Sequence, residues 1–328
     1  MWAWRKHRGN LEPIWEEVAV PRPHPTGLLV KLIAAGVCRS DHNLLTNENQ
    51  PAWFSEKFTL GHEGCGRIVE LGADVSSSAG FKVGDVIAML ALCTRARRSG
   101  IGNDGFYASY CVVDVRGAVH VPPGVTPSQA AVATDAVTTA YHAIHRRGKI
   151  TSKDVVFLFG LGGLGFNALQ VIRAIGAKVL VSDVKQENLD DAVKIGVDVA
   201  DTVPVGKDIK DWVEKNGWSG RISIVADFVG TAQTFSDAQH IVRQAGRLLC
   251  VGTLNHENIV HMKIAIRKRL DITFSYGGQI RDLKEALDLI SSGVLDPVVV
   301  DGKLEEFPRT LKELEAGKIK GRVSLLIE

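Results

Sequence analysis

The sequence has little of several features that mark specialised proteins. Its 39 Lys and Arg residues are nearly matched by 37 Asp and Glu residues, which leaves a formal net charge of +2. Such a balance argues against a protein that binds nucleic acid or a membrane surface through its charge. No apolar run reaches the ~18–20 residues of a membrane-spanning helix. Residues 1–13 lack the apolar core of a secretory signal, so we expect none.

Cysteine is scarce and scattered along the chain. The five cysteines are Cys38, Cys65, Cys93, Cys111 and Cys250. An odd number at irregular spacing excludes a disulfide framework and favours a reducing compartment, so we expect a cytoplasmic protein. With 328 residues, the chain has room for two domains with large cores and needs no disulfide bonds for stability.

The pattern of the sequence changes near residue 140. Before it, short β-rich segments at 28–35, 66–71, 85–89 and 110–115 lie between Gly and Pro turn signals, which is typical of a barrel-like β domain. Residues 128–147 are expected to be mostly helical. Further along, the expected strands are 154–159, 178–182, 222–227, 247–251 and 323–327, and the expected helices are 164–175, 186–195, 232–244 and 281–292. This alternation predicts an α/β fold with a doubly wound, mostly parallel sheet.

A glycine-rich turn follows the first strand of this alternation. Gly160, Gly162 and Gly165 have the G-x-G-x-x-G spacing, after an apolar strand and before an apolar helix. The first glycine permits a tight turn, the second lets backbone N–H groups approach a pyrophosphate, and the third lets the helix pack on its strand. We therefore expect Gly160, Gly162, Gly163, Leu164 and Gly165 to bind a dinucleotide. The alternative is a glycine-rich turn in some other α/β domain.

An acidic residue stands where the next strand ends. Asp183 follows Gly160 at close to the ~20-residue spacing of a carboxylate that binds the adenosine ribose. A carboxylate there accepts hydrogen bonds from the ribose hydroxyls and repels a 2′-phosphate, which favours NAD. Lys185 could offset that repulsion, so NADP stays open.

Three residues that bind metals elsewhere occur in distinctive settings. Cys38 lies in Gly-Val-Cys-Arg-Ser-Asp (36–41), His62 lies in Gly-His-Glu-Gly-Cys-Gly (61–66), and Asp135 lies in Ala-Thr-Asp-Ala-Val (133–137). Taken singly, each has an ordinary interpretation. Cys38 would be a buried small apolar residue, His62 a hydrogen-bonded histidine, and Asp135 a helix cap.

Together these motifs resemble the zinc-dependent medium-chain dehydrogenases/reductases, the alcohol dehydrogenase family. The resemblance covers nearly the whole chain and also includes the turn at 83–85, Gly-Phe-Tyr-Ala-Ser-Tyr-Cys-Val-Val (105–113), the glycine-rich turn and Gly277-Gly278. It implies a GroES-like catalytic domain over 1–139, joined by 278–328, and a Rossmann domain over 140–277.

The resemblance also implies a set of metal ligands. Cys38 and His62 match two ligands of a catalytic zinc, and Asp135 matches the third, which relatives place at the start of a helix. Glu63 resembles an alternating fourth ligand, and Asp41 matches an acid that orients His62. The lobe that carries a structural zinc in many relatives looks shortened here and retains only Cys93, so we expect one catalytic zinc and no structural zinc.

Further roles follow from the same resemblance. Ser40 would accept the alcohol proton, and His42 would pass it to solvent, although the usual relay histidine lies one position later, where this chain has Asn43. The alternative for His42 is an ordinary surface histidine. Other expected cofactor contacts are Arg39 and Arg322 on the pyrophosphate, Thr139 near the nicotinamide, and Val229, Gly252 and Ser275 near strand ends.

The predicted function is hydride transfer between NAD(H) and a small alcohol, ketone or aldehyde, carried out by a homodimer or homotetramer as in relatives. Two alternatives stay open. One is a zinc-free quinone or enone reductase of the same superfamily, and the other is a nucleotide-binding protein without catalytic activity.

Overall fold

The computed structural model describes residues 1–47, 49–91 and 98–327. Its contacts divide the chain into two compact units. Unit 1 comprises Met1–Thr138, Gly278–Gly293 and Pro297–Glu328, and unit 2 comprises Thr139–Gly277 and Val294–Asp296. Unit 1 is therefore assembled from the two ends of the chain, while almost all of unit 2 is one continuous segment.

Unit 1 is built around a long central strand. Its strands are β1 (Trp2–His7), β2 (Ile14–Glu17), β3 (Gly27–Val37), β4 (Lys57–Thr59), β5 (Glu63–Leu71), β6 (Val86–Leu90), β7 (Tyr110–Asp114), β8 (Ala118–His120), β14 (Val299–Lys303) and β15 (Arg322–Leu326). In the main sheet the order is β14-β15-β3-β5-β6-β8, with β7 also on β3, and a smaller sheet has the order β2-β1-β4. Antiparallel pairing sets Gly36 opposite Glu63, which brings the end of β3 beside the start of β5.

Unit 1 has four α-helices among the described residues outside the π-helical region. They are α1 (Arg39–Thr46), α2 (Pro127–Val132), α9 (Ile280–Ser291) and α10 (Phe307–Glu315). After α2 the chain continues through a π-helical turn, Ala133–Val137, into α3 (Thr138–Tyr141) and a second π-helical segment, His142–Arg147. Such turns recur at functional sites because they re-aim one side chain. The alternative that Asp135 is a helix cap is wrong: Thr126 caps α2, and Asp135 lies in the first turn of the π-helical segment.

An apolar core fixes these elements. Leu28, Leu32, Ile68, Phe106 and Phe307 are at most 1% exposed and belong to one cluster. They come from β3, β5, the segment before β7, and α10, so burying this apolar surface ties the C-terminal segment to the N-terminal strands.

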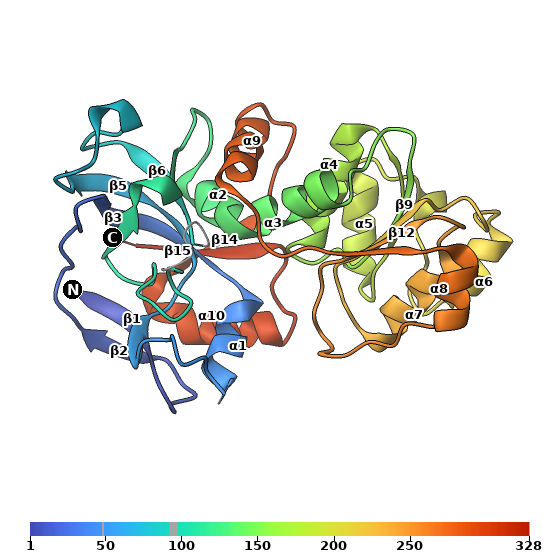
Figure 1. Ribbon diagram of the computed structural model, residues 1–328, viewed down its shortest axis with the longest axis horizontal. Coiled ribbons are helices and arrows are strands. Elements are labelled where there is room, and N and C mark those ends of the chain that lie inside the picture. The colour runs from blue at the N-terminus through green and yellow to red at the C-terminus, as the bar shows by residue number, and fades with distance from the viewer. Residues whose placement is uncertain (48, 92–97, 328) are drawn as a thin grey trace. The chain divides into compact units, whose positions relative to one another are not determined.

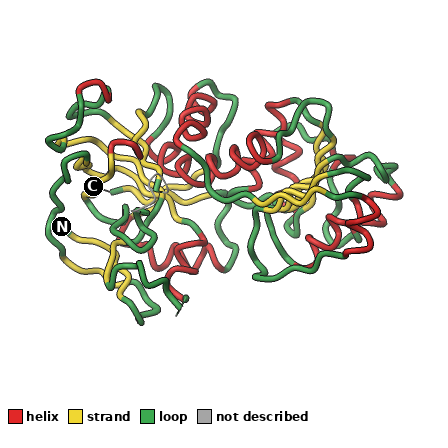
Figure 2. The backbone as a smooth tube through the Cα atoms, viewed as in Figure 1, coloured by secondary structure: helices red, strands yellow, loops and turns green. Residues whose placement is uncertain are grey.

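Unit 2 has an open parallel sheet. Its strands are β9 (Val155–Phe159), β10 (Lys178–Ser182), β11 (Ile224–Asp227), β12 (Arg247–Cys250) and β13 (Asp271–Phe274), in the order β10-β9-β11-β12-β13. Its helices are α4 (Gly165–Ile175), α5 (Gln186–Lys194), α6 (Ile209–Lys215), α7 (Ala232–Ile241) and α8 (Met262–Lys268). The helices cover both faces of the sheet (Figure 1), whose strands form one twisted layer (Figure 2). The order reverses at β9, as in a Rossmann fold.

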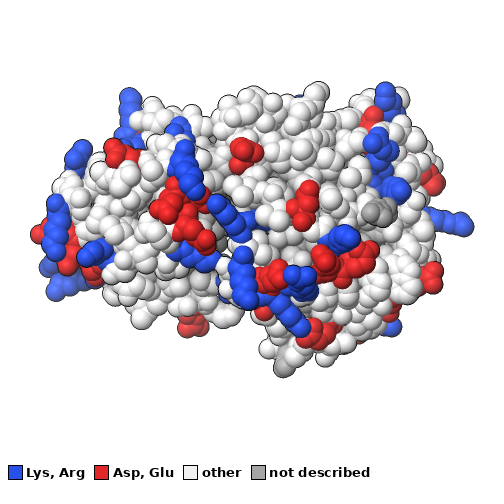
Figure 3. Space-filling view, turned by 180° about the vertical axis from the view of Figure 1, so that it is seen from behind, with Lys and Arg blue, Asp and Glu red and all other residues white. Residues whose placement is uncertain are grey.

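Acidic and basic side chains are interspersed on the face drawn in Figure 3. This distribution fits the formal net charge of +2. No helix among the described residues has both the length and the apolar character needed to cross a bilayer.

The predicted α/β class, with a GroES-like β-rich part and a Rossmann part, is confirmed. The expected strands and helices of both units are present, with ends shifted by a few residues. The helix expected over 232–244 ends earlier, at Ile241. The sequence analysis did not predict α1, α6, α8 and α10.

Candidate functional site

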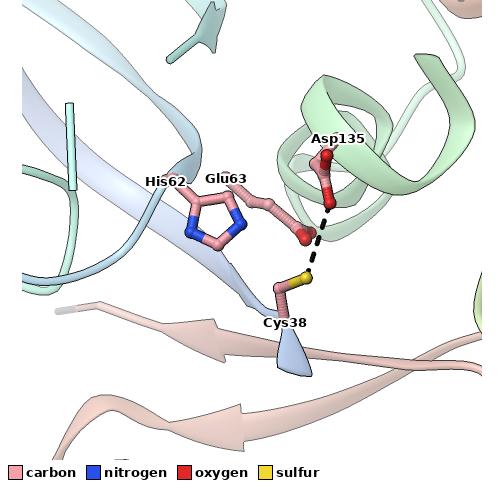
Figure 4. A group of neighbouring side chains, drawn as sticks. All are labelled: Cys38, His62, Glu63 and Asp135. Carbon is pink, nitrogen blue, oxygen red and sulfur yellow. Dashed lines mark hydrogen bonds between the residues drawn. The ribbon is translucent and has the colours of Figure 1, made fainter. Parts of the chain in front are cut away.

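Four ionisable side chains converge in unit 1 from three separate parts of the chain. Cys38 follows the last residue of β3, His62 and Glu63 lie at the start of β5, and Asp135 projects from the π-helical turn (Figure 4). One possible ligand atom from each residue lies within 4.8 Å of the ligand atoms of the other three. The distance from Cys38 Sγ to Asp135 Oδ2 is 3.6 Å. The tertiary structure thus assembles all four predicted metal ligands.

The donor set fits a zinc ion. A thiolate, an imidazole and a carboxylate are the ligand types of catalytic zinc sites. Both carboxylate oxygens of Glu63 are buried and accept no hydrogen bond in the described part of the chain, although Oε1 forms an ion pair with Arg322. Buried polar atoms without hydrogen bonds are rare in folded proteins, and they often mark a place where an ion binds.

A buried guanidinium lies against the same cluster. Arg322, the first residue of β15, is 4% exposed. Its Nη1 lies 3.2 Å from Glu63 Oε1 and donates to the carbonyl oxygen of Val37, and its Nη2 lies 3.3 Å from Asp135 Oδ2. Arg322 therefore balances part of the negative charge of the cluster. Its expected contact with a cofactor pyrophosphate stays a prediction.

The electrostatics of the cluster follow from burial and from these charges. Burial raises the pKa of Glu63 well above its usual range, although Arg322 acts in the opposite direction. Burial also opposes ionisation of Cys38, but Arg322 and His62 outweigh it and lower the pKa of the thiol. For His62, burial favours the neutral ring, yet the adjacent Asp41 raises the pKa well above its ordinary value.

Asp41 holds two of the ligands in place. This carboxylate is 0% exposed, and its Oδ1 lies 3.1 Å from Nδ1 of His62. Its Oδ2 accepts a hydrogen bond of 3.0 Å from the backbone N–H of Cys38. The hydrogen bond expected between Asp41 and His62 is therefore present, and it leaves Nε2 of the ring as the ligand atom.

The predicted proton-transfer residues lie on α1. Ser40 Oγ is 3.5 Å from Cys38 Sγ, which brings the hydroxyl beside the metal ligands. His42 Nε2 lies 3.2 Å from Glu315 Oε1 at the end of α10, with about a third of each side chain exposed. Arg39 begins α1 and is exposed. The sequence analysis did not anticipate the pairing of His42 with Glu315.

Unit 2 gathers the predicted cofactor residues along one edge of its sheet. Gly160 follows β9, Asp183 follows β10, Val229 follows β11 closely, Gly252 follows β12, and Ser275 follows β13. The carboxyl ends of parallel strands meet at this edge, which is where open α/β sheets bind their ligands. Thr139 lies buried in α3.

The glycine-rich turn has the geometry that its spacing predicts. Gly160 has a φ of +84°, and a Cβ on Gly165 would lie 1.9 Å from the carbonyl oxygen of Gly160. A Cβ on Gly162 would meet nothing within 4 Å, so this position faces open space. Asp183 Oδ2 accepts a 2.6 Å hydrogen bond from the backbone N–H of Leu161, which fixes the carboxylate beside the turn.

Comparison with known proteins agrees with both halves of this arrangement. The model of the alcohol dehydrogenase GroES-like domain matches residues 24–123, and that of the zinc-binding dehydrogenases matches residues 163–292. The chain is 30% identical to an acryloyl-coenzyme A reductase from Sulfurisphaera tokodaii, with 87% of each chain covered. It is 29% identical to an alcohol dehydrogenase from Geobacillus stearothermophilus, with 95% of each covered. The structure of acetophenone reductase from Geotrichum candidum in complex with NAD matches with a TM-score of 0.88 and 29% identity, covering 99% of this chain and 96% of that one.

The chain belongs to the zinc-binding alcohol dehydrogenase family. The family assignment is confirmed, as is the predicted enzyme class, an NAD(H)-dependent oxidoreductase of alcohols and carbonyl compounds. Cys93, on which the expected absence of a structural zinc depends, lies outside the described residues, as do Arg95 and Arg97.

In this dehydrogenase, two residues near the ligand cluster make contacts that the sequence did not predict. Arg322 was expected at the cofactor, not among the acids, because no local motif signals a pairing across almost the whole chain. Tyr107 lies within a motif that was used for the family resemblance, but it had no assigned role.

Proposed function

We propose that the dehydrogenase binds one catalytic zinc ion through Cys38, His62 and Asp135 and transfers hydride between NAD(H) and a small alcohol, ketone or aldehyde. The observation that carries this proposal is the convergence of four metal-binding side chains within 4.8 Å. Metal-binding residues that are distant in sequence, largely buried and supported by Asp41 are the expected arrangement of such a site.

Charge favours three ligands with Glu63 beside them. A Cys38 thiolate and an Asp135 carboxylate together neutralise a divalent cation, and His62 contributes a neutral ring. Glu63 has its own counter-ion, because Arg322 Nη1 lies 3.2 Å from its Oε1. A site with three protein ligands retains a position for the substrate oxygen.

The chemistry divides between the bound groups and the chain. Zinc held by these residues would supply Lewis acidity toward the substrate oxygen, and NAD(H) would supply the hydride chemistry. Ser40 Oγ, beside Cys38, would receive the proton of the alcohol while its own hydroxyl proton leaves toward solvent. His42 and Glu315 form an imidazole–carboxylate pair that reaches solvent and passes the proton on.

Unit 2 supplies the cofactor contacts in this proposal. The backbone N–H groups at Gly160, Gly162, Gly163, Leu164 and Gly165 bind the pyrophosphate at the start of α4. Asp183 binds the ribose hydroxyls, which favours NAD over NADP. Val229, Gly252 and Ser275 follow strands at the same edge. The family resemblance adds Thr139 in unit 2 and Arg39 and Arg322, which belong to unit 1.

A second candidate is reduction of an activated carbon–carbon double bond without zinc. It is favoured by the 30% identity to a protein named acryloyl-coenzyme A reductase. The complete donor set favours the zinc-dependent reaction instead, since a zinc-free enzyme has no need for Cys38, His62 and Asp135 together.

The proposal also covers the structural zinc, the cellular compartment and the oligomeric state. The shortened lobe around Cys93 favours the absence of a structural zinc. The free thiols of Cys38, Cys65, Cys111 and Cys250 fit a reducing compartment, the cytoplasm. From the family resemblance, we expect the working form to be a homodimer or homotetramer.

Metal analysis and substrate screening test the proposal together. We expect about one zinc per chain, and oxidation of alcohols with NAD that is lost on chelation and restored by zinc. A folded protein with less than ~0.5 zinc per chain that reduces enones with undiminished activity would support the second candidate instead.

A further inference from the structure

A buried tyrosine lies behind the metal ligands, in a part of unit 1 that the proposed chemistry does not use. Tyr107 is 0% exposed and precedes β7. Its hydroxyl lies 2.7 Å from Asp41 Oδ2 and 2.9 Å from the carbonyl oxygen of Gly36, and its single proton is shared between these two acceptors. The shorter contact is to the charged acceptor, and hydrogen bonds to ionised acceptors are the stronger ones.

This contact completes the set of partners around Asp41. The carboxylate faces His62 Nδ1 with Oδ1, and its Oδ2 accepts from the Cys38 backbone and from Tyr107. Without the phenol, the described partners of the Asp41 carboxylate would be the His62 ring and the Cys38 backbone N–H, both of which belong to proposed ligands. Tyr107 ties the carboxylate to a third, independent part of the unit.

The fold holds the tyrosine ring rigidly. Its backbone N–H donates to the carbonyl oxygen of Leu60, and its carbonyl oxygen accepts from the backbone N–H of Trp4. The ring packs against Phe307, with centroids 4.5 Å apart. Gly61, next to His62, has a φ of +89°, and a Cβ there would lie 2.5 Å from the ring. The residue before the ligand is thus a glycine whose missing side chain makes room for this ring.

We propose that Tyr107 is a positioning residue of the metal site: through its hydrogen bond to Asp41 it fixes the orientation of His62 and of the Cys38 backbone. This inference rests on the proposed metal site and adds a residue to it. The Tyr107 hydroxyl bonds to Asp41 and to the Gly36 carbonyl oxygen, so it acts on the ligands through Asp41 and takes no part in proton transfer.

The test is zinc affinity, measured by competition with a chromogenic chelator, for the full-length protein and its Tyr107→Phe variant. Phenylalanine keeps the ring packing and removes only the hydroxyl. We expect the dissociation constant to rise about 10-fold, the low end of the range for residues that support ligands. Tyr110→Phe makes the same change on β7, at a residue with no described contact to Asp41 or the proposed metal ligands. It should leave the dissociation constant of zinc unchanged. Cobalt substitution should show altered ligand-field absorption bands in Tyr107→Phe alone.

A double-mutant cycle separates positioning from general stability. In an Asp41→Asn background, Tyr107→Phe should cause little further loss of zinc affinity, because the hydrogen bond acts through Asp41. An unchanged dissociation constant in Tyr107→Phe would overturn the inference, and so would an equal loss in both backgrounds. Failure of the unsubstituted protein to bind zinc would overturn the metal site itself, and this inference with it.

Discussion

The two units differ in how far apart in sequence their functional residues lie. In unit 2, the glycine-rich turn and Asp183 belong to one strand–helix–strand segment, and the remaining predicted cofactor residues each follow a strand of the same sheet. In unit 1, the cluster combines residues from the end of β3, the start of β5, a π-helical turn and the C-terminal strand β15. A dinucleotide site can be encoded locally, whereas the ligand cluster exists only once the long-range pairing of unit 1 has formed.

The two sites also differ in the chemical groups that they use. The turn in unit 2 works mainly through backbone N–H groups, so its sequence must supply small residues at the right spacing. The cluster in unit 1 works through ionisable side chains whose pKa values depend on burial and on neighbours such as Asp41 and Arg322. Substitutions should therefore affect the two units separately.

The largest expected effect is that of Asp135→Ala. Removing one of the three proposed ligands should lower zinc affinity and turnover by more than about 100-fold, beyond the range of residues that only support ligands. NADH affinity, measured by fluorescence titration, should stay nearly constant because the cofactor residues of unit 2 are unchanged. Full activity in this variant would show that Asp135 is not a ligand and would remove the basis of the comparison.

Lys6→Met should weaken unit 1 without touching either site. Lys6 is 1% exposed, burial lowers its pKa, and its ammonium donates to the carbonyl oxygens of Asn10 and Leu45, the latter in the last turn of α1. Methionine keeps the packing but leaves these carbonyls without a donor, which should cost about 1–3 kcal/mol in the free energy of unfolding. Denaturant titration measures this loss, and the exposed Lys31→Met is the matched control. Equal free energies of unfolding for Lys6→Met and Lys31→Met would contradict the stabilising role of the Lys6 ammonium.

Asp183→Ser should act on unit 2 alone. Without the carboxylate, repulsion of a 2′-phosphate is removed, so the ratio of kcat/KM with NAD to that with NADP should fall by roughly 10-fold, about 1.4 kcal/mol. Zinc content should not change. Asp190→Ser, an exposed position on α5, controls for the general loss of negative charge. A constant cofactor ratio would refute the ribose assignment.

The smallest expected effect is a pH dependence of the stability of unit 1 and of its stabilisation by zinc. In the metal-free protein, the raised pKa of His62 gives stability that is fully present below about pH 6.5 and is lost as the pH rises through the raised value. Zinc requires the neutral ring and the Cys38 thiolate. The stabilisation by zinc, followed as an increase in Tm, should therefore grow with pH, by up to about 1.4 kcal/mol of unfolding free energy per pH unit for each proton released.

Asp41→Asn tests the cause of that dependence. Without the carboxylate that raises the His62 pKa, the zinc-induced increase in Tm should reach its plateau at a lower pH. A zinc effect that is the same at all pH values would contradict the assignment of His62 as a ligand that must lose a proton.

The sequence predicted elements with strong local signals better than elements that are positioned by long-range contacts. The apolar strands of unit 2 and the helix after the glycine-rich turn could be predicted because hydrophobic periodicity and glycine spacing act within a few residues. The helix α1 could not, since only Asp41 and Leu45 of its residues are buried, and it has too little apolar periodicity to be recognised. Its position is set instead by the end of β3 and by the bonds of Asp41.

The candidate site divides in the same way. Cys38, His62, Glu63 and Asp135 could be predicted because each lies in a motif resembling those of the family. The location of Asp135 inside a π-helical turn, the ion pairs of Arg322 and the hydrogen bond of Tyr107 could not, because each depends on contacts between segments far apart in the chain.

The amino-acid sequence by itself determined the two kinds of fold, the glycine-rich turn and the identity of the candidate metal ligands, because motif spacing and residue chemistry are local properties. Only the tertiary structure decided how those side chains are charged, oriented and supported. Burial and long-range pairing set the distances between Asp41, His62, Arg322 and the acids, and electrostatic energies depend on those distances and on the exclusion of water.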